Sequence, residues 1–156
     1  MHFMNKATIL LLLGGSMALF GESRLSEASM YCNLKKVQKC IVDWDMSVND
    51  YDEWGWTPFM WAVYNDCGPV TDYLLSKGAN PNLRTRKSYG SMYKGSTAIM
   101  MAAYYDKVAL VDQLLKAGAD PTLADSEGHN ALDCATKSET GSALPMLKKW
   151  VEAHPK

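Results

Sequence analysis

The feature that most constrains the fold of this chain is an internal repeat. Residues 55–63, Gly-Trp-Thr-Pro-Phe-Met-Trp-Ala-Val, match residues 95–103, Gly-Ser-Thr-Ala-Ile-Met-Met-Ala-Ala. Residues 70–81 have a copy at the same offset, in residues 110–121, whereas Gly95 has its next counterpart at Gly128. The base period is therefore 33, and one connection carries seven extra residues. A period of this length predicts a solenoid, because each unit must bury its apolar face against its neighbours.

Each repeat carries the signals of two short helices. Thr57 is suited to cap a helix that begins at Pro58, since proline fits the first helical position. Val70, Leu74 and Leu75 form an apolar stripe on a second helix, which the following glycine and proline can end. The pattern therefore predicts a stack of helix-turn-helix units.

A unit of this period with Thr-Pro, then a pair of small residues, then Leu-Leu-x-x-Gly-Ala-Asp-Pro resembles the ankyrin repeat. The resemblance implies an all-α solenoid of stacked helix-turn-helix units with β-turn fingers, in a domain spanning residues 22–154. Its four repeats would cover residues 22–50, 51–84, 93–123 and 124–153, with the insertion within 84–94. The two central repeats match the pattern closely, and the outer two are degenerate, as capping repeats tend to be.

The chain departs from the ankyrin pattern at a few positions. The histidine that usually follows Thr-Pro-Leu is Met60 or Met100 here, so we expect a buried side-chain hydrogen bond to be lost. Pro145 falls in the last expected helix and is compatible only with its first turn, where Ser142 is the candidate cap.

The N-terminal segment has the pattern of a secretory signal peptide. After Lys6 there is no charge in residues 7–21, which contain a leucine run followed by small residues. This pattern predicts a signal peptide of residues 1–18, with cleavage after Gly21 as the second choice. The uncharged run is shorter than the about 20 residues of a spanning helix. We therefore expect a periplasmic or secreted protein, an uncleaved membrane anchor being the alternative.

Charge and motifs exclude several classes of function. The 16 basic and 17 acidic residues leave no basic surplus for nucleic acid, and we expect no membrane association after cleavage. There is no glycine-rich phosphate loop, no nucleophile elbow and no zinc-ligand spacing. His129 falls at a turn tip and is expected to be a contact or solvent residue. We therefore expect a monomer that is not an enzyme and holds no cofactor or metal.

Ankyrin proteins usually bind partners through the finger tips and the first helices, which line a concave surface. In repeats two and three the candidate contact residues at these positions are Trp54, Trp56, Tyr64, Asn65, Tyr93, Lys94, Tyr104 and Tyr105. In repeat four the same positions hold Ser126, Glu127, His129, Lys137 and Ser138. Trp and Tyr are enriched in interface hot spots, so a protein-binding stripe is predicted. The alternative is that some rings pack on neighbouring turns, as we expect for the core residues Phe59, Trp61 and Tyr73.

The insertion is rich in basic residues and tyrosine. Arg84, Arg86 and Lys87, together with Lys94 and two tyrosines, lie within residues 84–94. This composition predicts a finger that reaches toward an acidic surface of the partner. A solvated flexible loop is the alternative interpretation.

Four cysteines allow three complete pairings. On the ankyrin pattern, Cys32 and Cys40 map to facing helices of repeat one, whereas Cys32 and Cys67 map to the turns of adjacent repeats. Either pair could form a disulfide bond, and we favour Cys32–Cys40. Cys134 aligns with the core position of Trp61, so a buried thiol is expected there.

The leading hypothesis is a small exported protein that binds another protein through an aromatic concave face. The resemblance suggests an immunity or inhibitor protein acting on a periplasmic toxin. An accessory protein for an envelope enzyme, of the catalase-associated type, is an alternative. Two further alternatives are an effector exported toward a host and a membrane-anchored envelope structural protein.

Overall fold

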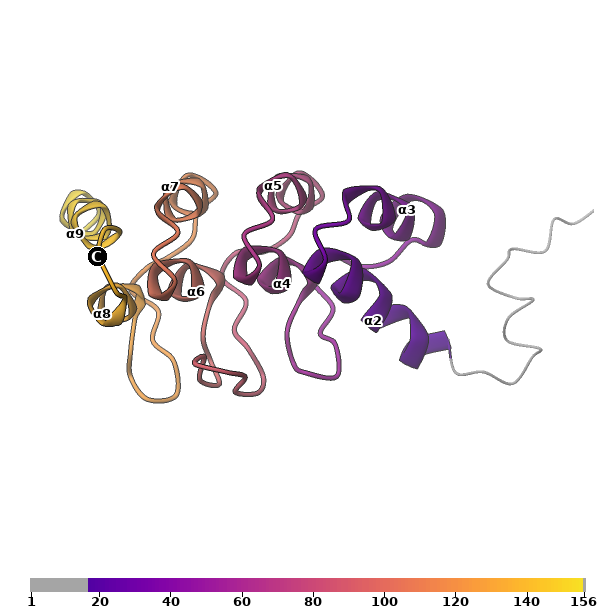
Figure 1. Cartoon of the computed structure of the whole chain (residues 1–156), viewed down its shortest axis with the longest axis horizontal. Coiled ribbons are helices and arrows are strands. Elements are labelled where there is room, and N and C mark those ends of the chain that lie inside the picture. Colours follow the sequence, from indigo (N-terminus) through magenta and orange to yellow (C-terminus); the bar gives the residue numbers. More distant parts are fainter. Residues whose placement is uncertain (1–16, 156) are drawn as a thin grey trace, which may run out of the picture.

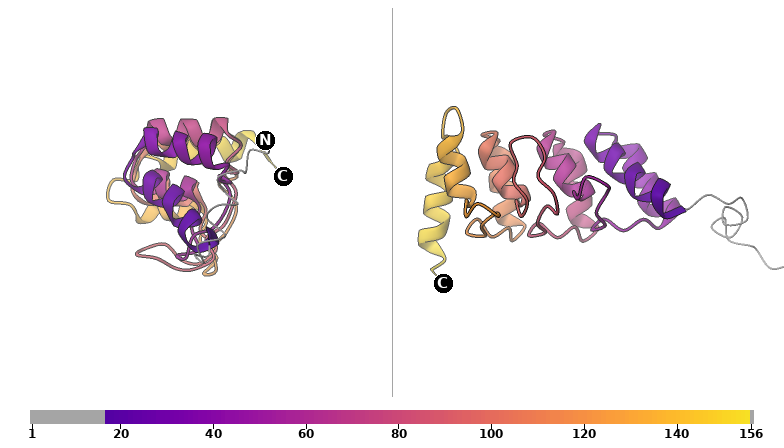
Figure 2. Two further views of the ribbon diagram at one scale, coloured as in Figure 1. Left: turned by 90° about the vertical axis from the view of Figure 1, so that its right-hand side faces the viewer. Right: turned by 90° about the horizontal axis from the view of Figure 1, so that it is seen from below.

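The computed structural model describes residues 17–155, which form a row of helix pairs (Figure 1). The helices are α2 (Met17–Met30), α3 (Leu34–Trp44), α4 (Pro58–Tyr64), α5 (Gly68–Ser76), α6 (Ala98–Tyr104), α7 (Val108–Lys116), α8 (Ala131–Lys137) and α9 (Leu144–Ala153). The first helices of the pairs form one layer and the second helices the other (Figure 1). Seen along the row, the long loops between pairs gather at the edge beside the first helices (Figure 2). The predicted all-α solenoid is confirmed.

The first helices of the central repeats begin as predicted. The Thr57 hydroxyl accepts a hydrogen bond from the Met60 backbone N–H at 3.3 Å, and Pro58 is the first residue of α4. The expected loss of a buried side-chain bond is only partly right: the Met60 sulfur accepts from the Thr57 N–H at 3.4 Å, whereas the buried Thr97 hydroxyl has no hydrogen-bond partner among the described residues. Met100 accepts from Thr97 in the same way, at 3.4 Å. A thioether is a weak acceptor, so methionine retains part of what a histidine would supply.

The last helix differs in one detail from the expectation. Pro145 lies in the first turn of α9, as predicted, but the residue that caps the helix is Ala143 and no side chain completes the cap. The Ser142 cap is therefore wrong, since its hydroxyl contacts the Thr140 hydroxyl at 2.6 Å instead. The Ala143 N–H is satisfied by Asp106 of the preceding repeat, at 3.2 Å.

The core lies between the two layers of helices. Phe59 and Trp61 on α4 are 1% and 2% exposed, which confirms their predicted core positions. Cys134, at the position in α8 that Trp61 has in α4, is a buried free thiol as expected. Burial raises the pKa of the Cys134 thiol to about 11. Tyr73 on α5 is only half-buried and packs at the edge of this core.

Asparagine side chains join successive repeats. The Asn49 side chain accepts from the Asn80 N–H at 2.8 Å and donates to the Gly78 carbonyl at 3.1 Å. Asn82, at the equivalent position of the next repeat, accepts from the Asp120 N–H at 2.8 Å and donates at 3.0 Å to the Gly118 carbonyl. Each asparagine therefore satisfies backbone groups that the end of the next repeat's second helix leaves open.

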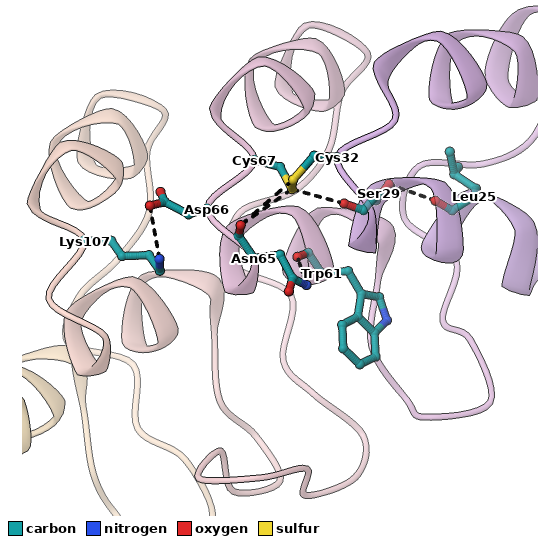
Figure 3. Close-up of a disulfide and its surroundings, with 8 residues drawn as sticks. All are labelled: Leu25, Ser29, Cys32, Trp61, Asn65, Asp66, Cys67 and Lys107. Carbon is teal, nitrogen blue, oxygen red and sulfur yellow. Dashed lines mark hydrogen bonds and ion pairs between the residues drawn. A yellow bond between two sulfur atoms is a disulfide. The ribbon is translucent and has the colours of Figure 1, made fainter.

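A second series of links joins the turns between the two helices of each pair. Cys32, Asp66 and Asp106 each have a positive φ, of 53°, 61° and 56°, one residue before the cap of the second helix. Cys32 forms a disulfide with Cys67 of the next repeat, and Asp66 forms an ion pair with Lys107 at 3.1 Å (Figure 3). A covalent bond and an ion pair thus occupy the same place between successive repeats.

The observed disulfide makes the favoured Cys32–Cys40 pairing wrong. The Cα atoms of Cys32 and Cys67 are 5.2 Å apart, a distance that suits a disulfide. Cys40 instead lies on the core side of α3, where it is fully buried as a free thiol. Burial raises the pKa of Cys40, although the positive charges of Lys36 and Arg24 act in the opposite direction.

The predicted signal peptide lies largely outside the described residues. The helix α2 begins at Met17 and continues past both candidate cleavage points, Ala18 and Gly21. The cleavage therefore stays a prediction. Among residues 17–155, no helix combines the length and the apolar character needed to cross a membrane.

Replacing Cys32 and Cys67 with serine is expected to lower the free energy of unfolding by about 3 to 4 kcal/mol. The two cysteines are 35 residues apart, and the crosslink restricts a loop of that size in the unfolded chain. Urea unfolding with and without reductant measures the effect: reduction should destabilise the wild type and leave the double variant unchanged. A wild-type midpoint that is insensitive to reductant would contradict the disulfide.

Candidate protein-binding surface

The loops between helix pairs, which we call fingers, close with the same turn in repeats two and four. In repeat two the Asp52 N–H donates to the Trp56 carbonyl and the Gly55 N–H donates to the Asp52 carbonyl, both at 2.9 Å. The Asp52 carboxylate accepts from the Trp54 and Trp56 N–H groups at 3.0 Å each. Asp125 makes the corresponding bonds in repeat four. An aspartate therefore holds the tip of each of these two fingers.

The insertion lies inside this turn in repeat three. Thr85 takes the place of the aspartate: its N–H donates to the Ser96 carbonyl, and its carbonyl accepts from the Gly95 N–H, both at 2.8 Å. The Thr85 hydroxyl accepts from the Ser96 N–H at 3.1 Å. Thr85 follows Asp52 by one full period of the repeat, so the register is kept and the extra residues are confined to the insertion loop, residues 86–94.

The insertion loop folds back on the protein. Tyr89 and Met92 exchange two backbone hydrogen bonds of 2.9 and 3.0 Å, and the Met92 side chain is buried. The Lys94 N–H donates to the Ser88 hydroxyl at 2.9 Å. The tight turn and the buried Met92 anchor this segment, and its other residues are exposed to solvent, as the alternative interpretation expects.

Two of the three cations predicted to meet an acidic partner are engaged within the protein. The Arg86 guanidinium lies over the Tyr51 ring at 3.8 Å, and Lys87 donates to the Glu53 carbonyl at 2.7 Å. Arg84 is exposed, and its carbonyl accepts from the Tyr51 hydroxyl at 3.0 Å. These contacts fix the positions of Arg86 and Lys87, but neither cation is paired with a carboxylate in the described part of the chain.

The rings of repeats two and three pack into one cluster, centred on Tyr89 of the insertion loop. The Tyr89 ring centroid lies 5.8, 5.4, 5.3 and 6.4 Å from those of Trp54, Trp56, Trp61 and Tyr64. Tyr64 continues the cluster to Tyr105 at 5.1 Å, and Tyr105 contacts Tyr104 at 5.1 Å. Edge-to-face contacts of this kind hold each ring in a fixed orientation.

Three rings of the cluster and the separate Tyr93 ring of the insertion loop are exposed to solvent. The exposed fractions are 50% for Trp54, 37% for Tyr89, 45% for Tyr93 and 37% for Tyr105. These four rings, with the half-buried Tyr64 and Tyr104, are called the aromatic face below. Asn65 and Lys94 are also exposed beside it.

Trp56 is predicted to be a contact residue, but its side chain lies in the core. It is fully buried, because its ring packs at a tilt against that of Trp61, with centroids 4.6 Å apart, and is covered by Tyr89. Its predicted role as a contact residue is therefore wrong. Tyr89 is not among the predicted contact residues, and the signal that could have found it is a tyrosine in an insertion next to tryptophan-rich fingers.

Asp52 anchors the inner side of the cluster. Its carboxylate is buried and accepts a hydrogen bond from the Trp61 indole N–H at 2.5 Å, in addition to the two backbone bonds of the finger turn. One side chain therefore fixes both the finger tip that carries Trp54 and the core ring beneath Tyr89.

On the outer side, a pair of hydroxyl groups joins repeats two and three. The Tyr105 hydroxyl donates to the Tyr64 hydroxyl at 3.3 Å. Burial and this contact raise the pKa of Tyr105 to about 12, although a hydrogen bond with Ser91 of the insertion loop acts in the opposite direction. The insertion loop thus touches both the rings and the hydroxyl groups of the face.

Comparison with known protein families identifies the family of this chain. Residues 3–85 match the family model for ankyrin repeats (3 copies), and residues 94–126 match that for an ankyrin repeat. The first match includes most of the segment for which we predict a signal peptide. The chain belongs to the ankyrin-repeat family.

Its relatives include longer proteins. Over 67 residues the chain is 37% identical to ankyrin repeat domain-containing protein 40 of Homo sapiens, covering 42% of this chain and 18% of that protein. Over 90 residues it is 28% identical to a putative ankyrin repeat protein of Borreliella burgdorferi, covering 55% and 41%. The chain thus spans less than half the length of these relatives.

Ankyrin repeats are typically non-enzymatic modules that bind other proteins, and the exposed rings suit that use. Within the described residues, no three His, Cys, Asp or Glu side chains are grouped to hold a metal ion.

Gly55→Ala is expected to destabilise the protein by about 2 to 4 kcal/mol. At Gly55, with φ of +73°, a Cβ atom would lie 2.9 Å from the Arg86 Cβ and 3.0 Å from the Lys87 nitrogen. Gly128 is the matched control: its φ is +82°, but no atom lies within 4 Å of a Cβ there, so alanine should cost about 1 kcal/mol. Equal unfolding free energies in urea would contradict the finger packing.

Tyr105 is expected to ionise near pH 12, above the ordinary tyrosine value of 10. Because the folded state holds this proton more tightly, its contribution to stability is intact below pH 10 and falls as pH rises toward 12. Ultraviolet titration of wild type and Tyr105→Phe isolates this group, with circular dichroism showing that the fold persists. Tyr64→Phe should lower the Tyr105 pKa; an unchanged late phase in Tyr105→Phe would refute the assignment.

Proposed function

We propose that this chain is an exported protein-binding module that docks on another protein through its aromatic face. The observation that carries the proposal is the exposure of Trp54, Tyr89, Tyr93 and Tyr105 in repeats two and three. Exposed tryptophan and tyrosine bury much area for little loss of side-chain entropy, which is why they dominate interface hot spots.

The aromatic face is already ordered before a partner arrives. Tyr89 and Tyr105 are held by ring contacts, and the finger that carries Trp54 is held by Asp52. A surface that is rigid in the free protein loses little conformational entropy on binding, so more of its contact energy becomes affinity. The packing of the rings on one another therefore supports the binding role.

Export is supported by two independent features. The N-terminal sequence has the pattern of a signal peptide, and Cys32 and Cys67 form a disulfide between repeats. Disulfides persist in oxidising compartments and are rare in the cytosol. We place the mature protein, as a monomer, in the periplasm or outside the cell. N-terminal sequencing that finds a start near Leu19 or Glu22 would exclude the membrane-anchored alternative.

Within this role we favour an immunity or inhibitor protein that blocks a periplasmic toxin. A small rigid module with one dense aromatic face suits stoichiometric inhibition, because covering an active site needs tight contact over a limited area. An accessory protein for an envelope enzyme, such as a catalase, is the alternative. The identity of the captured partner decides between them.

Replacing Trp54, Tyr93 and Tyr105 together with alanine is expected to weaken partner binding by about 100-fold or more. The matched control replaces Val42 and Trp44, which are exposed on α3, in the layer of second helices. Both variants and the wild type are used to capture proteins from the native envelope, and affinities are then measured with the purified partner. Loss of binding in the control but not in the first variant would overturn the proposal.

A further inference from the structure

The repeats present different chemistry at one shared position of the surface. In repeat two, Trp56 follows the finger turn and its ring contacts Tyr64, the last residue of α4, at 5.3 Å. In repeat four the equivalent residues are His129 and Lys137, the last residue of α8. The Lys137 Nζ lies 2.8 Å from the His129 Nε2. A pair of rings in one repeat is therefore replaced by a lysine–histidine pair two repeats later.

The charge of Lys137 is not neutralised by a neighbouring carboxylate. Asp133 lies one helical turn earlier, at the spacing where a carboxylate commonly pairs with a lysine. Its carboxylate instead accepts from the Asn130 N–H at 2.9 Å as part of the α8 cap. Among residues 17–155, no carboxylate lies within ion-pairing distance of Lys137. Its ammonium group can only donate, so His129 accepts through Nε2 and keeps its own proton on Nδ1.

A second acidic group, Asp125, lies beside His129 and holds the finger turn. The Asp125 carboxylate accepts from the Glu127 and His129 N–H groups at 2.9 and 3.0 Å, and lies 3.7 Å from the His129 Nδ1. Asp125 therefore orients the imidazole from one side, while Lys137 approaches it from the other. This arrangement leaves the ammonium group exposed beside an oriented ring.

Tyr93 connects this cation to the aromatic face. Its exposed ring lies 5.8 Å from the His129 ring. The surface thus runs from tryptophan and tyrosine in repeats two and three to a cation without a carboxylate partner in repeat four.

We propose that the Lys137–His129 pair binds a carboxylate of the partner, in a protein segment whose apolar side chains lie on the aromatic face. An Asp or Glu side chain would pair with the Lys137 ammonium, and an adjacent apolar side chain would pack on Tyr93. This inference rests on the proposed function and adds to it the polarity of the bound segment: apolar over repeats two and three, acidic over repeat four.

The test uses peptides selected from a random displayed library on the immobilised full chain. The tightest peptide and its version with Glu→Gln or Asp→Asn are then measured against wild type, Lys137→Met and Lys148→Met. Lys148 is an exposed lysine on α9 and serves as the matched control. Removal of the peptide carboxylate should weaken binding about fivefold to wild type and to Lys148→Met, but not to Lys137→Met.

The outcomes separate this inference from the proposed function. Selected peptides without acidic residues, or an equal loss with Lys137→Met and wild type, would overturn the carboxylate site while the aromatic face stands. Peptide affinity that is unchanged by Trp54→Ala would instead contradict the aromatic face. Thermal unfolding of each variant shows whether a change reflects binding or loss of the fold.

Discussion

A single helix pair cannot bury its own apolar side chains, so contact between neighbouring repeats decides the rest of this structure. Three kinds of contact join neighbouring repeats. Phe59 and Trp61 fill the core between helices, Asn49 and Asn82 satisfy backbone groups of the next repeat, and the turns between paired helices are linked in series. The disulfide is one member of that series, and it joins repeat one covalently to repeat two.

The insertion shows how strictly this register is kept. Its extra residues are placed within a finger turn, with Thr85 standing in for the aspartate of the other turns, so no helix shifts relative to its neighbour. The loop then supplies Tyr89, which covers Trp56 and leaves Trp54 exposed. A departure from the repeat is therefore what distinguishes the surface of this protein from a regular stack.

The sequence predicts the fold well and the surface only in part. Spacing is enough to place the helices, the Thr57 cap and the core position of Cys134, because each depends on local order repeated along the chain. Trp54 and Trp56 flank the same glycine, and no spacing rule shows that one faces out and the other in. That outcome depends on a ring from an insertion with no equivalent in other repeats. The predicted Cys32–Cys40 pairing is wrong for a related reason: the sequence spacing does not show that Cys40 faces the core.

The central claim is that the stacked repeats hold a row of rings outward for another protein. Hydroxyl-radical footprinting of the complex with the captured partner tests it most directly, because it reports the accessibility of each tyrosine and tryptophan in one experiment. We predict that Trp54, Tyr89, Tyr93 and Tyr105 are protected in the complex, while Trp44 on α3 reacts as in the free protein. Protection confined to Trp44, with the four rings still reactive, would contradict the account.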